Sequence, residues 1–133
     1  MYQDLFDEFL RSHDTLRVYA GKRLIFGSGE GRLLPWLKYL GQSGPRRRPV
    51  ICDKVMGNAA ALLAVKAGCR EVYSPLGSQL AIRTLDKYGI KHHIAKTIPY
   101  IQKGDGEEIC PMEALSIDKG PEEFYEAVKD IIK

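Results

Sequence analysis

The stretch DKVMGNAAALLAVKAGCREVYSPLGSQLAIRTLDKYGIKHHIAK, residues 53–96, decides the fold. Small and apolar residues fill nearly every side of a helix over 53–67, and Gly68 follows where a C-terminal cap belongs. This composition predicts a buried central helix. The pattern after it predicts a strand, a helix and a second strand, at residues 70–74, 78–88 and 90–96. Such alternation is typical of parallel strands joined by right-handed crossovers.

The preceding segments predict an amphipathic helix, a β-hairpin and a short helix, at residues 2–12, 16–26 and 33–40. Gly21-Lys22 lies between the two β-rich runs, and a Gly-X pair favours a type II′ turn. Residues 42–49 combine glycine, prolines and arginines, which is typical of a loop. We therefore expect the sheet to begin with an antiparallel hairpin.

The C-terminal third is less regular. Residues 97–117 fit no long element, because Pro99 and Pro111 interrupt them and a turn is expected at 104–106. A final helix is expected from Pro121, with an apolar docking face formed by Phe124, Ala127, Val128 and Ile131. Together these elements predict one α/β domain over residues 1–133, with three layers and a mixed sheet.

Composition excludes several classes of protein. Twenty Lys and Arg against 17 Asp and Glu give a formal charge of +3, which is too small to indicate a nucleic-acid partner. The three cysteines form no CxxC pair, so a reducing compartment is expected. The acidic N-terminus is unlike a signal peptide, and the most apolar stretch, 55–65, is too short to span a membrane. We expect a cytoplasmic protein that does not bind a membrane.

Two polar residues precede predicted helices and mark a candidate ligand site. Asp53 and Ser78 each stand where a side chain can cap free backbone N–H groups, and capping alone explains both. In an open α/β sheet, helix N-termini also gather at the carboxyl ends of strands and attract anions. If the two helix starts lie side by side, they form an anion site.

Lys54 and Asn58 are four residues apart, so on the predicted helix they share one stripe near its N-terminus, beside Gly57. A lysine there opposes the helix dipole, which is a local inconsistency typical of a functional site. The alternative is that the Lys54 side chain extends to solvent.

Cys110 and Glu113 lie in the irregular segment before the last helix. Glu113 or a histidine could act on the Cys110 thiol, although a free cysteine is more often a small buried hydrophobe. His92 and His93 point to opposite faces of a strand, so only one of them can join any given site. The basic run at 46–48 has no interleaved aromatic residue and is interpreted as a solvated loop.

The block at 52–90, together with IPYIQ at 98–102 and CPMEAL at 110–115, resembles the domain-of-unknown-function family 1893. The resemblance runs over nearly the whole chain, and its most specific segments match DKxxGxAAA and CPME. The family is placed in the cytidine-deaminase-like fold, which implies a mixed sheet opened by an antiparallel hairpin. Its biochemical function is unassigned.

The deaminase chemistry of that fold does not carry over to this chain. Deaminases place His-x-Glu or Cys-x-Glu before the central helix, and this chain has Cys52-Asp53-Lys54 there. Where deaminases have Pro-Cys-x-x-Cys, residues 75–79 are PLGSQ and contain no cysteine. We therefore expect no zinc and no other cofactor, and no hydrolytic deamination.

The leading hypothesis is a zinc-free domain that binds a small anionic or nucleotide-like molecule at the N-termini of two helices. Its candidate lining consists of Asp53, Lys54, Gly57, Asn58, Ser78, Cys110 and Glu113. One alternative is an enzyme that uses Cys110 as nucleophile or redox centre, with Lys54 lowering its pKa. Another is a structural or oligomerising module, such as a homo-oligomer, which would expose an apolar face instead of a polar cleft.

Overall fold

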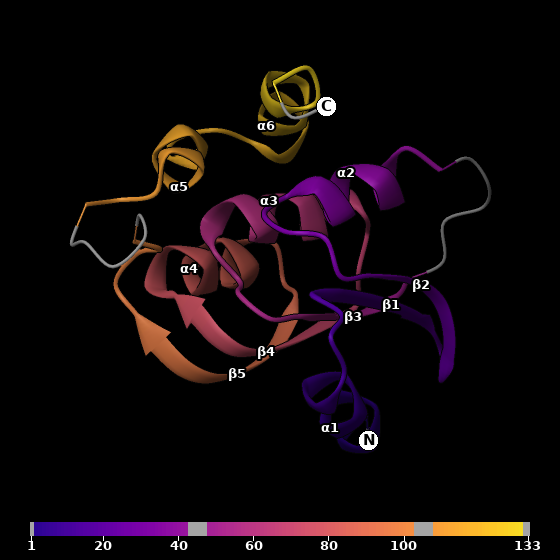
Figure 1. The fold of residues 1–133 in the computed structure, drawn as a ribbon. Helices are drawn as coiled ribbons and strands as arrows, with labels where there is room; N and C mark the ends of the chain where they lie inside the picture. The colour runs from indigo at the N-terminus through magenta and orange to yellow at the C-terminus, as the bar shows by residue number, and fades with distance from the viewer. Residues whose placement is uncertain (1, 43–47, 103–107, 132–133) are drawn as a thin grey trace.

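A computed structural model describes residues 2–42, 48–102 and 108–131 of the chain (Figure 1). In these residues a five-stranded mixed sheet is combined with six helices. The strands are β1 (Leu16–Ala20), β2 (Arg23–Ser28), β3 (Val50–Asp53), β4 (Glu71–Ser78) and β5 (Lys91–Ile98). The helices are α1 (Gln3–Arg11), α2 (Leu34–Leu40), α3 (Asn58–Lys66), α4 (Gln79–Lys87), α5 (Pro111–Ser116) and α6 (Pro121–Val128).

The sheet has the order β2-β1-β3-β4-β5. Strand β1 pairs antiparallel with both β2 and β3, whereas β3, β4 and β5 are parallel. The predicted hairpin is confirmed, and Gly21 between its strands has φ +60°, as the first central position of a type II′ turn requires. The predicted parallel pairing of β4 with β5 is confirmed as well.

Helices lie on both faces of the sheet (Figure 1). Helix α1 covers one face, where Phe6 and Phe9 pack with Tyr73 and Cys52. Helices α2, α3 and α4 lie on the other face, and α5 and α6 pack on the outer side of α3. The residues of α3 from Asn58 to Ala64 are all buried, so the prediction of a buried central helix is confirmed.

The predicted start of that helix is wrong. Residues 50–53 form strand β3, and α3 begins at Asn58, after a short link in which Met56 pairs with Gly77. The reason is that β3 lies between β1 and β4 and is buried along its whole length. A fully buried strand shows no alternation of polar and apolar residues, so its sequence merges with the apolar helix that follows.

Two C-terminal expectations need correction. Helix α5 occupies residues 111–116, where no element was expected, because Pro111 begins the helix instead of interrupting it. The docking face of α6 consists of Phe124 and Val128, which are buried, while Ile131 is 62% exposed beyond the helix. The expected turn at 104–106 and the first two arginines of the run at 46–48 lie outside the described residues. Within the described residues, no helix is long and apolar enough to cross a membrane.

Candidate functional site

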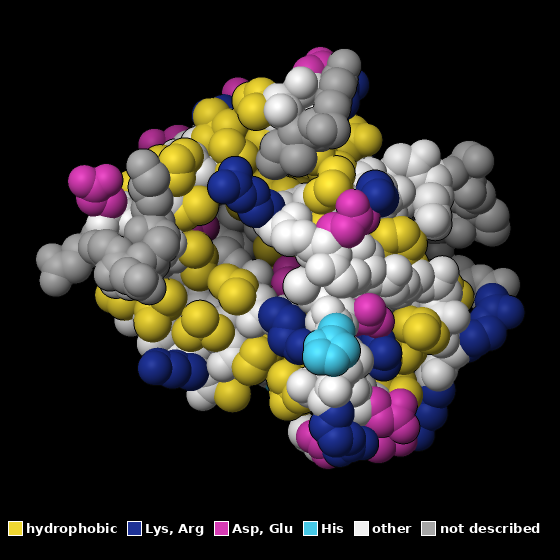
Figure 2. Space-filling model, in the orientation of Figure 1, with side chains coloured by type: hydrophobic (Ala, Val, Ile, Leu, Met, Phe, Trp, Pro, Cys, Tyr) yellow, Lys and Arg dark blue, Asp and Glu magenta, His cyan; other side chains and the backbone are white. Residues whose placement is uncertain are grey.

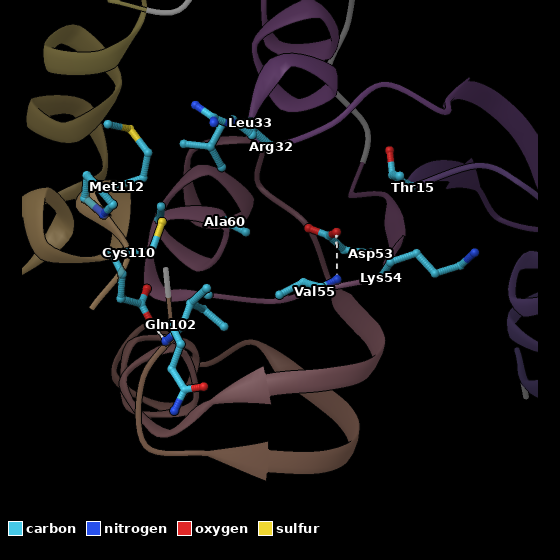
Figure 3. Close-up of a pocket in the computed structure, with 15 residues that line it drawn as sticks. Thr15, Arg32, Leu33, Asp53, Lys54, Val55, Ala60, Gln102, Cys110 and Met112 are labelled. Carbon is cyan, nitrogen blue, oxygen red and sulfur yellow. Dashed lines mark hydrogen bonds between the residues drawn. The ribbon is translucent and has the colours of Figure 1, made fainter. Parts of the chain in front are cut away.

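A cavity of about 470 Å³ opens where strand β3 ends and helix α3 begins (Figure 3). Figure 2 shows a hollow on this side of the molecule, bordered mainly by hydrophobic side chains. The apolar part of the cavity wall is formed by Leu33, Val55, Ala59, Ala60, Ile101 and Met112. A few polar side chains complete the lining. A largely apolar cavity with few polar groups is the usual form of a small-molecule site.

Asp53 brings a carboxyl group to this cavity from the last position of β3. Asp53 is buried, with only 8% of its surface exposed. The indole N–H of Trp36 donates to Oδ2 at 2.8 Å, and the backbone N–H of Val55 donates to Oδ1 at 3.3 Å. Burial raises the Asp53 pKa to about 7, against the opposing effect of these hydrogen bonds. Near neutral pH, the carboxyl therefore exists in both protonation states.

Lys54 borders the same cavity, but its ammonium group lies elsewhere. The Lys54 Nζ donates to the backbone carbonyl of Ser12 at 3.1 Å and lies 4.8 Å from the centre of the Phe9 ring. In Figure 3 the side chains of Asp53 and Lys54 point in opposite directions. Residue 54 also precedes α3, so the expected stripe shared by Lys54 and Asn58 does not exist.

Glu113 occupies the N-terminus of α3, where the sequence predicted an anionic ligand. Its side chain comes from α5 and is 2% exposed. Oε1 accepts the backbone N–H of Asn58 at 2.5 Å, and Oε2 accepts the backbone N–H of Ile101 at 2.9 Å. A carboxylate of the chain itself thus accepts a free backbone N–H at the start of the helix. Its negative charge also interacts favourably with the helix dipole.

Gly57 permits this close approach. A Cβ atom at position 57 would lie 2.7 Å from Cγ1 of Ile101 and 3.0 Å from Oε1 of Glu113. Both distances are shorter than ordinary van der Waals contacts, so a larger residue would displace the Glu113 carboxylate or the Ile101 side chain. Gly57 itself lines the cavity, at the point where Ile101 and Glu113 approach its backbone.

Asn58 and Ser78 are not part of this cavity lining. The Asn58 amide donates to Ser116 Oγ at 2.9 Å and accepts from the hydroxyl of Thr84, beside a second cavity of about 370 Å³. Ser78 is buried, and its Oγ accepts the N–H of Ala81 at 3.0 Å, which confirms the predicted cap of α4. The Ser78 N–H donates to the Met56 carbonyl, so this helix start faces the backbone of the link.

Cys110 lies half-buried on the cavity wall, immediately before α5. The structure does not place the Lys54 ammonium beside it, because that group is bonded to Ser12. Cys52 and Cys69 are buried, and burial raises the pKa of each thiol to about 12. The cysteine-enzyme alternative therefore loses the cation that was expected to activate Cys110.

Alkylation with iodoacetamide is expected to modify Cys110 before Cys52 and Cys69, because only Cys110 among them is accessible. Cys110 is therefore more exposed than the small buried hydrophobe that a free cysteine more often is. Lys54→Ala should leave the rate at Cys110 unchanged, as judged by mass spectrometry of timed samples. A several-fold slower reaction in Lys54→Ala would restore the cysteine-enzyme alternative.

The residues present do not fit a deaminase zinc site. Cys52 faces α1, on the side of the sheet opposite the Asp53 carboxyl, and it packs with Phe9 and Tyr73. Near the start of α4, Ser78 offers only a hydroxyl that already caps the helix. Across the described ranges, no three His, Cys, Asp or Glu side chains are grouped so that they could hold a metal ion.

Sequence reasoning missed three residues that shape the site: Arg32, Trp36 and Gln102. Arg32 and Gln102 line the cavity, and Trp36 holds the Asp53 carboxyl from α2. Arg32 follows the glycine-rich segment 27–31 and has φ +57°, which is uncommon for a residue other than glycine. That unusual backbone is visible only in the structure, and the sequence offers no signal that joins Trp36 to Asp53.

Comparisons with known proteins place the chain among relatives of undetermined function. The family described as Domain of unknown function (DUF1893) matches residues 7–132. The crystal structure of a DUF1893 family protein from Thermotoga maritima is similar, with a TM-score of 0.88 and 25% sequence identity. That match covers 98% of this chain and 88% of the Thermotoga chain. No curated protein matches the chain.

Proposed function

Because this chain belongs to the DUF1893 family, which has no assigned biochemical function, we propose a role from its cavity: it binds a small nucleotide-like molecule. The flat heterocycle of this ligand occupies the apolar part of the cavity, and its anionic group lies at Arg32. The observation that carries the proposal is one cavity that combines apolar walls, the Asp53 carboxyl and a cation.

Size and chemistry support this ligand class. A cavity of about 470 Å³ is within the range, roughly 300–1,000 Å³, of typical small-molecule sites. Aliphatic side chains such as Leu33, Val55 and Met112 offer the apolar contact that a heterocyclic ring needs. Asp53 and Gln102 supply hydrogen-bonding groups that can orient the ring.

The anionic group is assigned to Arg32 and not to the helix N-termini. At α3 the Glu113 carboxylate already fills the N-terminus, and it would repel a second anion. Two cations line the cavity, and the ammonium of Lys54 is bonded to Ser12. Arg32 is exposed, and it makes no ion pair with any residue in the described part of the chain. A guanidinium also binds phosphate in a bidentate manner.

Titration calorimetry with GMP and IMP tests this assignment. Arg32→Ala is expected to weaken the binding of both nucleotides about tenfold or more, because each loses its charge-assisted phosphate contact. Lys54→Ala is the matched control, since it removes a cavity-lining cation whose charged group points away, and it should change neither affinity. Equal losses in the two variants, or no binding of either nucleotide by the natural protein, would contradict the proposal.

The cytidine-deaminase-like fold and the cytoplasmic location belong to the same proposal. The antiparallel hairpin β1–β2 beside the parallel strands β3, β4 and β5 supports the fold, because this arrangement is what the resemblance implied. The oligomerisation alternative is supported by Leu24 and Ile25, two neighbouring exposed apolar residues on the edge strand β2.

A further inference from the structure

We propose that Asp53 selects heterocycles that present two adjacent N–H donors, as the N1–H and 2-amino edge of guanine does. This inference rests on the proposed function and names the ligand class more closely. Its structural basis is a nearly buried carboxyl group at the end of β3, with both oxygens held in place and directed at one cavity.

Within the described residues, each Asp53 oxygen accepts one hydrogen bond of ordinary geometry. Oδ2 accepts from the Trp36 indole at 2.8 Å, and Oδ1 accepts from the Val55 backbone at 3.3 Å. A carboxylate offers about four acceptor sites on its two oxygens, so each oxygen retains capacity for one further donor. Two parallel N–H groups match the spacing of carboxylate oxygens, as the guanidinium–carboxylate pair demonstrates.

Trp36 and Val55 also fix the direction of the carboxyl group. The Trp36 side chain is itself 1% exposed within the core, and Val55 contributes a backbone group, so neither partner moves freely. In Figure 3 the Asp53 carboxyl points from the end of β3 towards Ala60, which lines the apolar part of the cavity. A ring seated against that wall can therefore present one edge to Asp53.

The other charged groups around the cavity do not compete for this role. Glu113 is the second carboxylate in the lining, but it is 2% exposed against 8% for Asp53, and its bonds to the backbone at Asn58 and Ile101 hold it against the start of α3. The Lys54 ammonium is bonded to Ser12, and Arg32 is left for the anionic group of the ligand. Cys110 offers only a weak thiol donor or acceptor. Asp53 is thus the more accessible of the two carboxylates in the lining.

GMP and IMP form the decisive pair of probes, because they share ribose and phosphate and differ by the 2-amino group. At pH 8 we expect GMP to bind the natural protein about tenfold more tightly than IMP, since IMP leaves one carboxylate oxygen without its second donor. In Asp53→Asn this ratio should fall to about one, because the amide N–H then faces the 2-amino group of GMP. Contacts at Arg32 are the same for both nucleotides and cancel in the ratio.

A pH series on the natural protein gives the same test without a substitution. The two-donor edge requires the ionised carboxylate, and the Asp53 pKa is about 7 in the free protein. The affinity for GMP should therefore fall about tenfold between pH 8 and pH 6, as the ionised fraction falls. The affinity for IMP should fall less.

The outcomes separate this inference from the proposed function. If GMP and IMP bind with equal affinity, or if Asp53→Asn keeps the preference for GMP, the proposal that Asp53 selects the base is wrong. The proposal that the cavity binds a nucleotide then still stands. A GMP affinity that rises as the pH is lowered would also overturn it, because the ligand would then accept a proton or hydrogen bond from Asp53. If neither nucleotide binds, both proposals fail.

Discussion

Above pH 7, the Asp53→Asn variant is expected to be more stable than the natural protein. Burial raises the Asp53 pKa from 3.8 to about 7, so the folded state holds the proton more tightly than the unfolded state does. The stability contributed by protonated Asp53 is fully present below about pH 3.8 and is lost as the pH rises towards 7. A pKa rise of this size corresponds to about 4 kcal/mol.

Asparagine is uncharged at every pH, so the Asp53→Asn variant does not lose stability through ionisation at position 53. It gives up part of the bonding to Trp36 or Val55, which costs about 1 kcal/mol at every pH. At pH 8 the variant should therefore gain about 3 kcal/mol in the free energy of unfolding, and near pH 4 it should be the less stable protein.

Urea unfolding of both proteins from pH 4 to pH 8 measures this crossover. The difference between natural protein and variant is the informative quantity, because shifts at other groups, such as the lowered pKa of Glu71, cancel in it. Asp7→Asn, on the exposed side of α1, is the control and should show a nearly constant difference. A constant difference for Asp53→Asn as well would mean that Asp53 titrates as an ordinary surface carboxyl.

Glu113→Ala is expected to lower the free energy of unfolding by about 3 kcal/mol. The substitution leaves the backbone N–H groups of Asn58 and Ile101 without their acceptor, and each buried unpaired donor costs about 1–3 kcal/mol. It also removes the negative charge from the N-terminus of α3. For a chain of this length, the melting temperature should fall by roughly 10 °C.

Two further variants calibrate this result in thermal unfolding experiments. Glu113→Gln keeps one acceptor oxygen, so it should lose about half as much stability as Glu113→Ala. Glu126→Ala removes an exposed glutamate of α6 that pairs with Lys129, and it should change stability far less than Glu113→Ala does. Equal losses for Glu113→Ala and Glu126→Ala would show that the bonds of Glu113 contribute nothing to stability.

Local sequence patterns correctly predicted the elements that a few neighbouring residues determine. The hairpin depends on Gly21, and helix α4 depends on the Ser78 cap and on Gly89, which has φ +71°. Strand β3 was missed because burial along its whole length removes the alternation that marks a strand. Helix α5 was missed because Pro111 is compatible both with a break and with a first helical turn.

The site was predicted less completely, because its key contacts join distant parts of the chain. Asp53, Lys54, Gly57, Cys110 and Glu113 were expected at the ligand site, and all five line the cavity. The role of Glu113 was not foreseen, since its bond to Asn58 spans 55 positions in sequence. The direction of Lys54 depends on the carbonyl of Ser12, 42 residues earlier, which no local pattern encodes.

The link from Glu113 to the start of α3 also determines when the cavity is completed during synthesis. As the chain leaves the ribosome, all five strands and helices α1 to α4 emerge before residue 111, so the sheet has its full set of strands before α5 is made. Until Glu113 arrives, the N-terminus of α3 and the backbone of Ile101 have no carboxylate to join them. The cavity is therefore completed only after α5 has been made, later than the sheet on which it rests.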